Sequence, residues 1–196
     1  MRSRPGNVTA PFDIPSVVRR VHFAYRAEGD GWTGGHTTYG ATVRGRAISL
    51  TPYHYAHGVV PGARAAPRPE PPDLPGRPAT PALRPTVGAP LRLETVSIAR
   101  GDARVPPRSP AAAVGQDGAL RLAGGGVTEE LENREAGFEQ RWRFAAPLRG
   151  TGDLVVRVRT AGQRFVGTTE RGLHFVDPTS GLGFRYGWAS WIDATG

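Results

Sequence analysis

Arginines at alternating positions are the residues of this sequence best suited to chemistry. They form two pairs toward the C-terminal end, Arg141 with Arg143 and Arg157 with Arg159. A guanidinium group is always charged and donates paired hydrogen bonds to carboxylate, sulfate or phosphate groups. Alternate residues of a β-strand point to the same face, so the members of each pair share a face. If the two strands are neighbours, the four side chains form one exposed basic surface that could bind a polyanion.

Aromatic side chains close to these arginines are the second candidate. Trp188 and Trp191 each offer a broad apolar ring with one N–H donor, and such a ring can stack on a sugar. Trp142 and Phe144 alternate with Arg141 and therefore occupy the opposite strand face. A stacking platform for nucleic-acid bases is not expected on the arginine face. We predict sugar stacking by Trp188 and Trp191, and no specific nucleic-acid binding.

A glutamate-rich segment is the best source of catalytic carboxylates. Its members are Glu129, Glu130, Glu132, Glu135 and Glu139. Two carboxylates could cleave a glycosidic bond, but a glutamate run of this kind is more typical of a solvated face. The sequence has no Gly-x-Ser-x-Gly motif to mark a nucleophilic serine. We therefore predict no enzymatic activity and no catalytic residue. The hydrolase alternative predicts that a Glu139→Gln variant is inactive.

Three histidines give the nearest approach to a metal motif. His54 and His57 follow His36, but side chains three residues apart in a strand or turn do not point the same way. No carboxylate lies between Ile48 and Pro69 to complete a site. The chain has no cysteine, which excludes disulfides, thiolate metal sites and thiol nucleophiles. We predict no metal site and no cofactor.

The overall charge sets limits on partners and mechanisms. The sequence has 25 basic and 17 acidic residues, a formal net charge of +8, and every basic residue is arginine. Absence of lysine excludes Schiff-base and P-loop chemistry. In a chain rich in alanine, glycine and proline, this arginine usage is typical of a GC-rich genome. Because the arginines are spread along the chain, the charge predicts nonspecific affinity for polyanions.

The elements that must position these side chains are β-strands. The sequence contains 27 glycines and 19 prolines, which excludes an all-α fold and favours turn-rich β structure. Alternation in residues 17–26, an extended pattern in 32–43 and alternation in 47–51 predict a strand meander within residues 1–60. Ten prolines from Pro61 to Pro90 predict a linker or wrapped surface segment over residues 61–90.

Residues 91–196 are predicted to form a β-sandwich-like domain. The alternation that starts at Leu91 changes phase at Val96, as at a β-bulge. Residues 127–136 fit either a helical turn or a polar edge strand. An antiparallel meander is predicted from alternation in residues 138–144, 154–159 and 184–188, with a further strand at 191–192. The prediction is an all-β, antiparallel β-sandwich-like fold with an irregular proline-rich connection.

The N-terminus and the hydropathy give expectations about targeting. Residues 1–4 are basic, but residues 5–9 are not the apolar run of a signal peptide. No window approaches the length of apolar sequence that a transmembrane helix needs. We expect no membrane insertion, and either a cytoplasmic protein or a chain whose leader has been removed.

Short motifs in the second half carry a resemblance to a known group. They are Glu132-Asn133-Arg134, Gly137-Phe138-Glu139-Gln140-Arg141-Trp142, Asp153-Leu154-Val155-Val156-Arg157-Val158, Gly172-Leu173-His174-Phe175, Leu182-Gly183-Phe184-Arg185-Tyr186-Gly187 and Asp193-Ala194-Thr195-Gly196. Over residues 90–196, with a weaker echo at 17–52, the chain resembles the N-terminal β-rich region of large secreted proteins of myxobacteria and related bacteria. In that group the region precedes FG-GAP, integrin-like repeats. The resemblance implies an exported, noncatalytic module and supplies no site residues.

Two functions follow as expectations. The first is a structural or interaction module of an exported or cell-surface protein, which contacts other protein modules or like subunits through edge strands. The second is a binding module for an acidic extracellular polymer, either a polysaccharide or a nonspecifically bound nucleic acid. Its contact residues would be the four arginines, with Trp188 or Trp191 stacking on a sugar.

Overall fold

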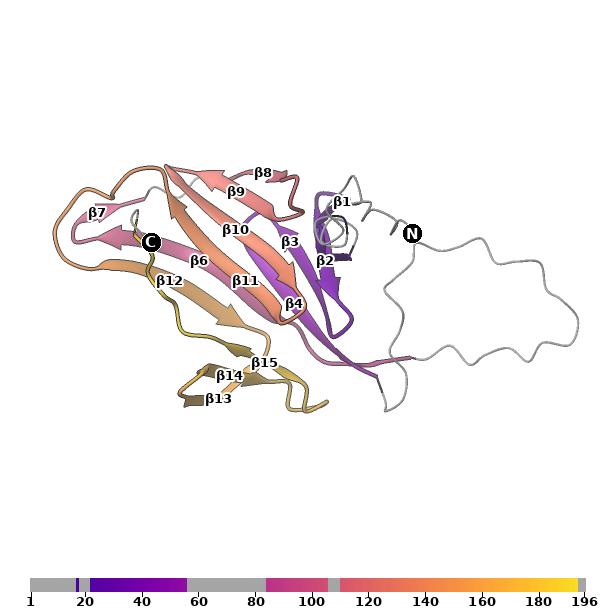
Figure 1. Cartoon of the computed structure of the whole chain (residues 1–196). Coiled ribbons are helices and arrows are strands. Elements are labelled where there is room, and N and C mark those ends of the chain that lie inside the picture. Colours follow the sequence, from indigo (N-terminus) through magenta and orange to yellow (C-terminus); the bar gives the residue numbers. More distant parts are fainter. Residues whose placement is uncertain (1–16, 18–21, 56–83, 106–109, 194–196) are drawn as a thin grey trace, which may run out of the picture.

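The chain forms an antiparallel β-sandwich with a small third sheet at one end (Figure 1). The computed structural model describes residues 17, 22–55, 84–105 and 110–193. Nearly all regular structure in these residues is strand, so the predicted all-β, sandwich-like fold is confirmed. No helix in these ranges has both the length and the apolar character needed to cross a membrane.

The larger layer is an eight-stranded sheet. Its central path runs β1-β2-β3-β4-β6-β12, with β5 paired to β4 and β7 paired to β6. The strands are β1 (Arg26–Glu28), β2 (Gly31–His36), β3 (Tyr39–Arg44), β4 (Ala47–His54), β5 (Thr86–Val87), β6 (Leu91–Arg100), β7 (Ala103–Arg104) and β12 (Leu154–Ala161). Because β4 pairs with β6, the segments on either side of the proline-rich stretch belong to one sheet. Residues 56–83, most of that stretch, lie outside the described residues.

The facing layer and the end sheet come from the second half of the chain. The facing sheet has the order β11-β10-β9-β8, and the end sheet has the order β13-β14-β15. Their strands are β8 (Ala111–Val114), β9 (Leu120–Gly124), β10 (Val127–Arg134), β11 (Gly137–Phe144), β13 (Arg164–Thr169), β14 (Gly172–Val176) and β15 (Gly183–Tyr186). Residues 127–136 fit either a helical turn or an edge strand in the sequence. The structure has the strand β10 there, and β10 lies between β9 and β11 rather than at the edge of its sheet.

The core lies between the two large sheets because each strand directs every second side chain inward. Ile48 and Leu93 from the eight-stranded sheet, and Leu120 and Leu131 from the four-stranded sheet, are 0 to 1% exposed. Phe175 of β14 joins the same cluster, so the end sheet closes one end of the sandwich. Full burial of one such side chain contributes roughly 1.5–3 kcal/mol.

A β-bulge interrupts the pairing of β6 with β12, as the phase change at Val96 predicts. Arg157 is opposite Ser97, but Val158 is opposite Thr95, so Val96 is the extra residue. The predicted bulge is confirmed, and it restores an inward position for Ile98, which is 4% exposed.

Three predicted elements differ from the structure. Val17, His22 and Phe23 are helical, so the strand predicted for residues 17–26 is wrong and pairing begins at Arg26. The extended run 32–43 is two strands, because the chain reverses at Thr37 and Thr38 after Gly35, whose φ is 138°. No strand forms at residues 187–193.

The meander predicted across residues 138–188 is only partly present. β11, β12 and β13 belong to three different sheets, and only β13, β14 and β15 pair in succession. Alternation identifies the faces of a strand but not its partners, and the loops after β11 and β12 transfer the chain between sheets.

Candidate functional site

The four predicted arginines lie on opposite outer faces of the sandwich. On β11, Arg141 is directly opposite Glu130 of β10, on the solvent side of the four-stranded sheet. On β12, Arg157 and Arg159 are opposite Ser97 and Glu94 of β6, on the solvent side of the eight-stranded sheet. Since β11 pairs with β10 and β12 pairs with β6, the two strands are not neighbours. The prediction of one surface containing all four arginines is wrong.

Arg141 and Arg143 belong to an ion-pair cluster, here called the Glu130 cluster. Strand register places Arg121, Glu130 and Arg141 in one row across β9, β10 and β11. The Glu130 side chain is 3% exposed, and its carboxylate lies 2.6 Å from Nη2 of Arg121 and 2.8 Å from Nε of Arg143. The whole cluster contains Asp117, Glu130, Glu132, Glu139, Arg121, Arg134, Arg141 and Arg143.

The Glu130 cluster is balanced in charge, with four carboxylates and four guanidinium groups. Nε of Arg141 is 2.6 Å from Oε1 of Glu139. The Arg121 guanidinium lowers the pKa of Asp117 through a hydrogen bond. The positive charges of Arg141 and Arg143 are therefore offset within the protein, which weakens this face as a site for a polyanion.

Trp188 and Trp191 follow β15 on a segment that returns along the sandwich (Figure 1). They are 58% and 67% exposed. The indole N–H of Trp188 donates to the carbonyl of Glu170 at 3.1 Å, in the turn between β13 and β14. The Trp191 ring lies 6.0 Å from the ring of Phe144, at the end of β11. The two rings are held by different sheets, and sugar stacking on them stays a prediction.

A buried network around Glu129 joins all three sheets, and it was not among the predicted sites. Glu129 is 5% exposed and faces the interior from β10. Its Oε1 accepts hydrogen bonds from the Thr95 hydroxyl of β6 and the Gln140 amide of β11. The Gln140 carbonyl in turn accepts from the Tyr186 hydroxyl of β15 at 2.8 Å. The indole N–H of Trp142 donates to the Thr95 oxygen at 3.1 Å.

The signal for this network was present in the sequence. Val127, Glu129, Leu131 and Asn133 share one phase of the alternation, so Glu129 falls on the face of the apolar residues. The interpretation of the glutamates as a solvated face is wrong for Glu129 and Glu130, both of which are buried.

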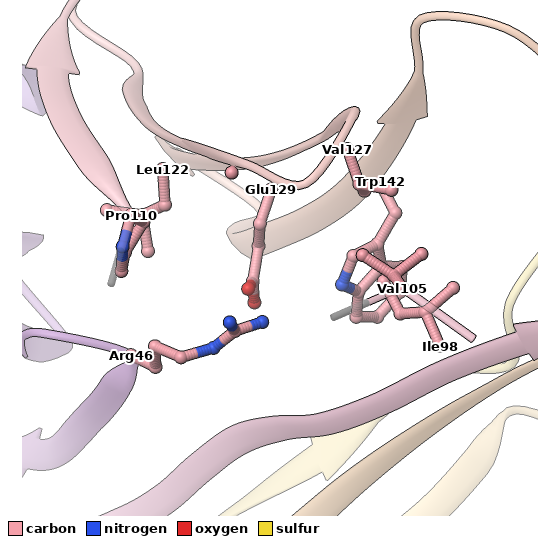
Figure 2. Close-up of a pocket in the computed structure, with 9 residues that line it drawn as sticks. Arg46, Ile98, Val105, Pro110, Leu122, Val127, Glu129 and Trp142 are labelled. Carbon is pink, nitrogen blue, oxygen red and sulfur yellow. The ribbon is translucent and has the colours of Figure 1, made fainter. Parts of the chain in front are cut away.

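The surroundings of Glu129 change its acidity. Burial raises its pKa, and the hydrogen bonds from Gln140 and Thr95 and the charge of Arg46 oppose this to a lesser extent. Figure 2 shows Arg46, from the turn between β3 and β4, pointing toward the Glu129 carboxylate. Burial, with the nearby charge of Glu129, also raises the pKa of Tyr186 to about 12, so its hydroxyl stays protonated as a donor.

A small cavity lies beside Glu129, between the sheets. Its lining includes Arg46, Ile98, Val105, Pro110 and Trp142 (Figure 2). Its volume is about 20 Å³. That is room for about one water molecule, far less than the roughly 300–1,000 Å³ of sites that bind small organic ligands. The geometry makes Glu129 a cross-link between sheets.

A second polar cross-link attaches the end sheet. Asp177, which is 7% exposed, accepts hydrogen bonds from the Ser180 hydroxyl at 2.6 Å and from the Ala89 N–H at 3.0 Å. The Gln163 amide donates to the Ala89 carbonyl at 2.7 Å. The backbone N–H and the carbonyl of Ala89, just before β6, are thus each hydrogen-bonded by a side chain of the end-sheet region.

The histidines are dispersed in the structure. The His36 ring stacks on Phe23 with 5.5 Å between centroids, and His54 is exposed on β4. His57 lies outside the described residues. Within the ranges that the structure describes, no group of three or more His, Asp or Glu side chains is arranged to hold a metal ion.

Comparisons with models of protein families, with curated proteins and with solved structures find no match to this chain. The resemblance to secreted proteins of myxobacteria therefore remains a prediction.

Proposed function

We propose that this chain is a noncatalytic structural or interaction module that associates with a second copy through the edge strand β8. Its placement in an exported or cell-surface protein is proposed from the motifs in residues 90–196 and would be tested by detecting the protein outside the cell with an antibody. The polar side chains buried inside the sandwich support a structural role, because Glu129, Asn133, Asp177 and Gln163 are used to tie segments together.

The uncharged edge strand β8 carries this proposal. An edge strand presents unpaired N–H and C=O groups that can pair with another chain. Proteins prevent such pairing with charged residues, bulges or short edge strands. Among the described edge strands of three or more residues, each contains a charged residue except β8. Ala111, Ala112 and Ala113 of β8 are exposed, and β8 pairs only with β9 in the described part of the chain.

Two copies of β8 could pair about a twofold axis. Antiparallel strands lie about 4.8 Å apart, and alanine side chains allow that approach. Such a dimer would join two four-stranded sheets into one continuous sheet, and the contact would be the same patch on both copies. Since main-chain hydrogen bonds form it, salt should have little effect on it.

Light scattering on the purified chain, over a concentration series at low and high salt, tests the proposal. We expect a dimer that persists at high salt, and an Ala111→Glu variant that is monomeric because it places charge on the edge. The matched control is Ala123→Glu, since Ala123 is the register partner of Ala111 and is also exposed, but lies one strand inside the sheet. A monomeric wild type, or equal effects of the two variants, would overturn the proposal.

A further inference from the structure

Three exposed arginines on the outer face of the eight-stranded sheet have no carboxylate partner among the described residues. Arg92 is opposite Ser49 of β4, Arg157 is opposite Ser97, and Arg104 of β7 is opposite Ala99. Ala99 is in turn opposite Val155, which shares its face with Arg157. Strand register therefore places Arg92, Arg104 and Arg157 on one face.

A fourth arginine and a single acid complete this face. Arg159 lies between Arg92 and Arg157 along the paired strands and contacts Glu94 at 3.2 Å. We call Arg92, Arg104, Arg157 and the Arg159–Glu94 pair the β6–β12 arginine face. Four arginines and one glutamate leave an excess of three positive charges, whereas the Glu130 cluster on the opposite side is balanced.

The side chains between these arginines are two serines, an alanine and two exposed valines. Ser49 and Ser97 flank Arg92 and Arg157 on neighbouring strands, and Ala99 lies opposite Arg104. The valines are Val96 at the bulge and Val155 of β12. Serine hydroxyls can both donate to and accept from sugar hydroxyls. Since no aromatic ring lies among these positions, the surface does not offer the stacking that single-stranded nucleic acids use.

The face is long enough to require an extended ligand. From Arg92 to Ala99, the position opposite Arg104, the rise of a strand gives roughly 20 Å. A single sugar acid cannot reach both ends, but a chain with repeated acidic groups can. We propose that the β6–β12 arginine face binds an acidic polysaccharide, with the guanidinium groups holding its carboxylate or sulfate groups. This site differs from the β8 edge and does not depend on it.

Calorimetry with heparin as the probe tests this proposal on the full chain. We expect binding that weakens about tenfold or more between about 50 and 200 mM salt, as for a few released counterions. The variant Arg92→Gln/Arg157→Gln should weaken binding by an order of magnitude. The control Arg164→Gln/Arg185→Gln removes two exposed arginines of the end sheet, with the same change in net charge, and should change affinity less than about twofold.

Three further measurements test whether the β6–β12 arginine face, rather than net charge, binds a polysaccharide. Equal losses in the two double variants would show attraction to net charge alone and overturn the proposal. A DNA duplex that binds as tightly as heparin, with the same dependence on Arg92 and Arg157, would overturn the choice of polysaccharide. Uncharged dextran should not bind. Light scattering on Arg92→Gln/Arg157→Gln should still show the β8 dimer, so failure of one proposal is distinguishable from failure of the other.

Discussion

Glu129 and Glu130 are adjacent, and β10 directs them to opposite faces of its sheet. Glu129 enters the interior, where hydroxyl and amide donors surround it. Glu130 lies on the solvent side, but Arg121 and Arg143 cover it. Two neighbouring glutamates are therefore buried in different ways: Glu129 mainly through hydrogen bonds from uncharged groups, and Glu130 through ion pairs with arginines. Removing each should have a different effect.

Replacing Glu130 should lower stability and raise affinity for polyanions. In Glu130→Gln, Arg121, Arg141 and Arg143 lose a shared carboxylate, and the free energy of unfolding should fall by about 1–3 kcal/mol. The cluster then has one more guanidinium group than carboxylates, and Arg143 loses its ion-pair partner, so heparin binding should strengthen. Urea denaturation and heparin titration would measure the two effects. The control is Glu135→Gln, which removes the same charge at an exposed position. Equal behaviour of both variants would contradict the role of the cluster.

Replacing Glu129 should change how stability depends on pH. Because burial raises its pKa in the folded state, Glu129 contributes stability below its ordinary pKa, and this contribution is lost as pH rises through the raised value. The stability of the wild type relative to Glu129→Gln should therefore decrease as pH rises from about 4 toward neutrality. The pKa of Tyr186, which also lies near Glu129, is raised to about 12, so Tyr186 keeps its proton over this range. Urea denaturation of both proteins across this pH range measures the difference in their free energies of unfolding. A difference that does not change with pH would refute the prediction.

At the scale of elements, sequence alternation predicted strands and faces but not neighbours. It located β11 and β12 and the bulge at Val96, because inward and outward positions follow directly from residue type. It did not reveal that β12 pairs with β6, since that choice depends on register between distant segments. The predicted site is wrong at this step, because Arg157 and Arg159 share one outer face of the sandwich and Arg141 and Arg143 share the other.

The turn between β12 and β13 depends on one glycine. Gly162 has φ of 92°, and a Cβ there would overlap the carbonyl oxygen of Pro90. Gly162→Ala should therefore lower the free energy of unfolding by about 2–4 kcal/mol, through strain and displacement of the strand. Gly45→Ala is the control, because its φ is 58° but the added methyl meets no atom. Thermal unfolding of the two variants and the wild type compares their stabilities. A Gly45 variant as unstable as the Gly162 variant would show that φ alone matters.

At the scale of the molecule, polar side chains hold the end sheet to the sandwich. Asp177 makes one of these attachments, and the Ser180 hydroxyl and the Ala89 and Thr179 N–H groups lower its pKa to about 2. A lowered pKa means that its stabilising effect is complete above the unfolded value near 3.8 and is lost as pH falls from about 4 to about 2.

Acid should therefore loosen this attachment, and Asp177→Asn should reduce the response. We expect the wild type to have a higher free energy of unfolding than Asp177→Asn at a pH of about 4. This difference should shrink as the pH falls to about 2. Chemical denaturation at the two pH values measures the difference. A difference that stays constant over this range would contradict the role of Asp177.

The unequal charge of the two outer faces has a directional consequence. A sandwich that is balanced on one side and carries excess positive charge on the other has an electric dipole across its thin dimension. Near an anionic layer it would rotate until the eight-stranded sheet faces that layer. The edge strand β8 lies in the plane of its own sheet, roughly parallel to the layer in that orientation. Copies adsorbed this way would present their β8 edges sideways to one another, so the anionic layer would favour formation of the β8 dimer.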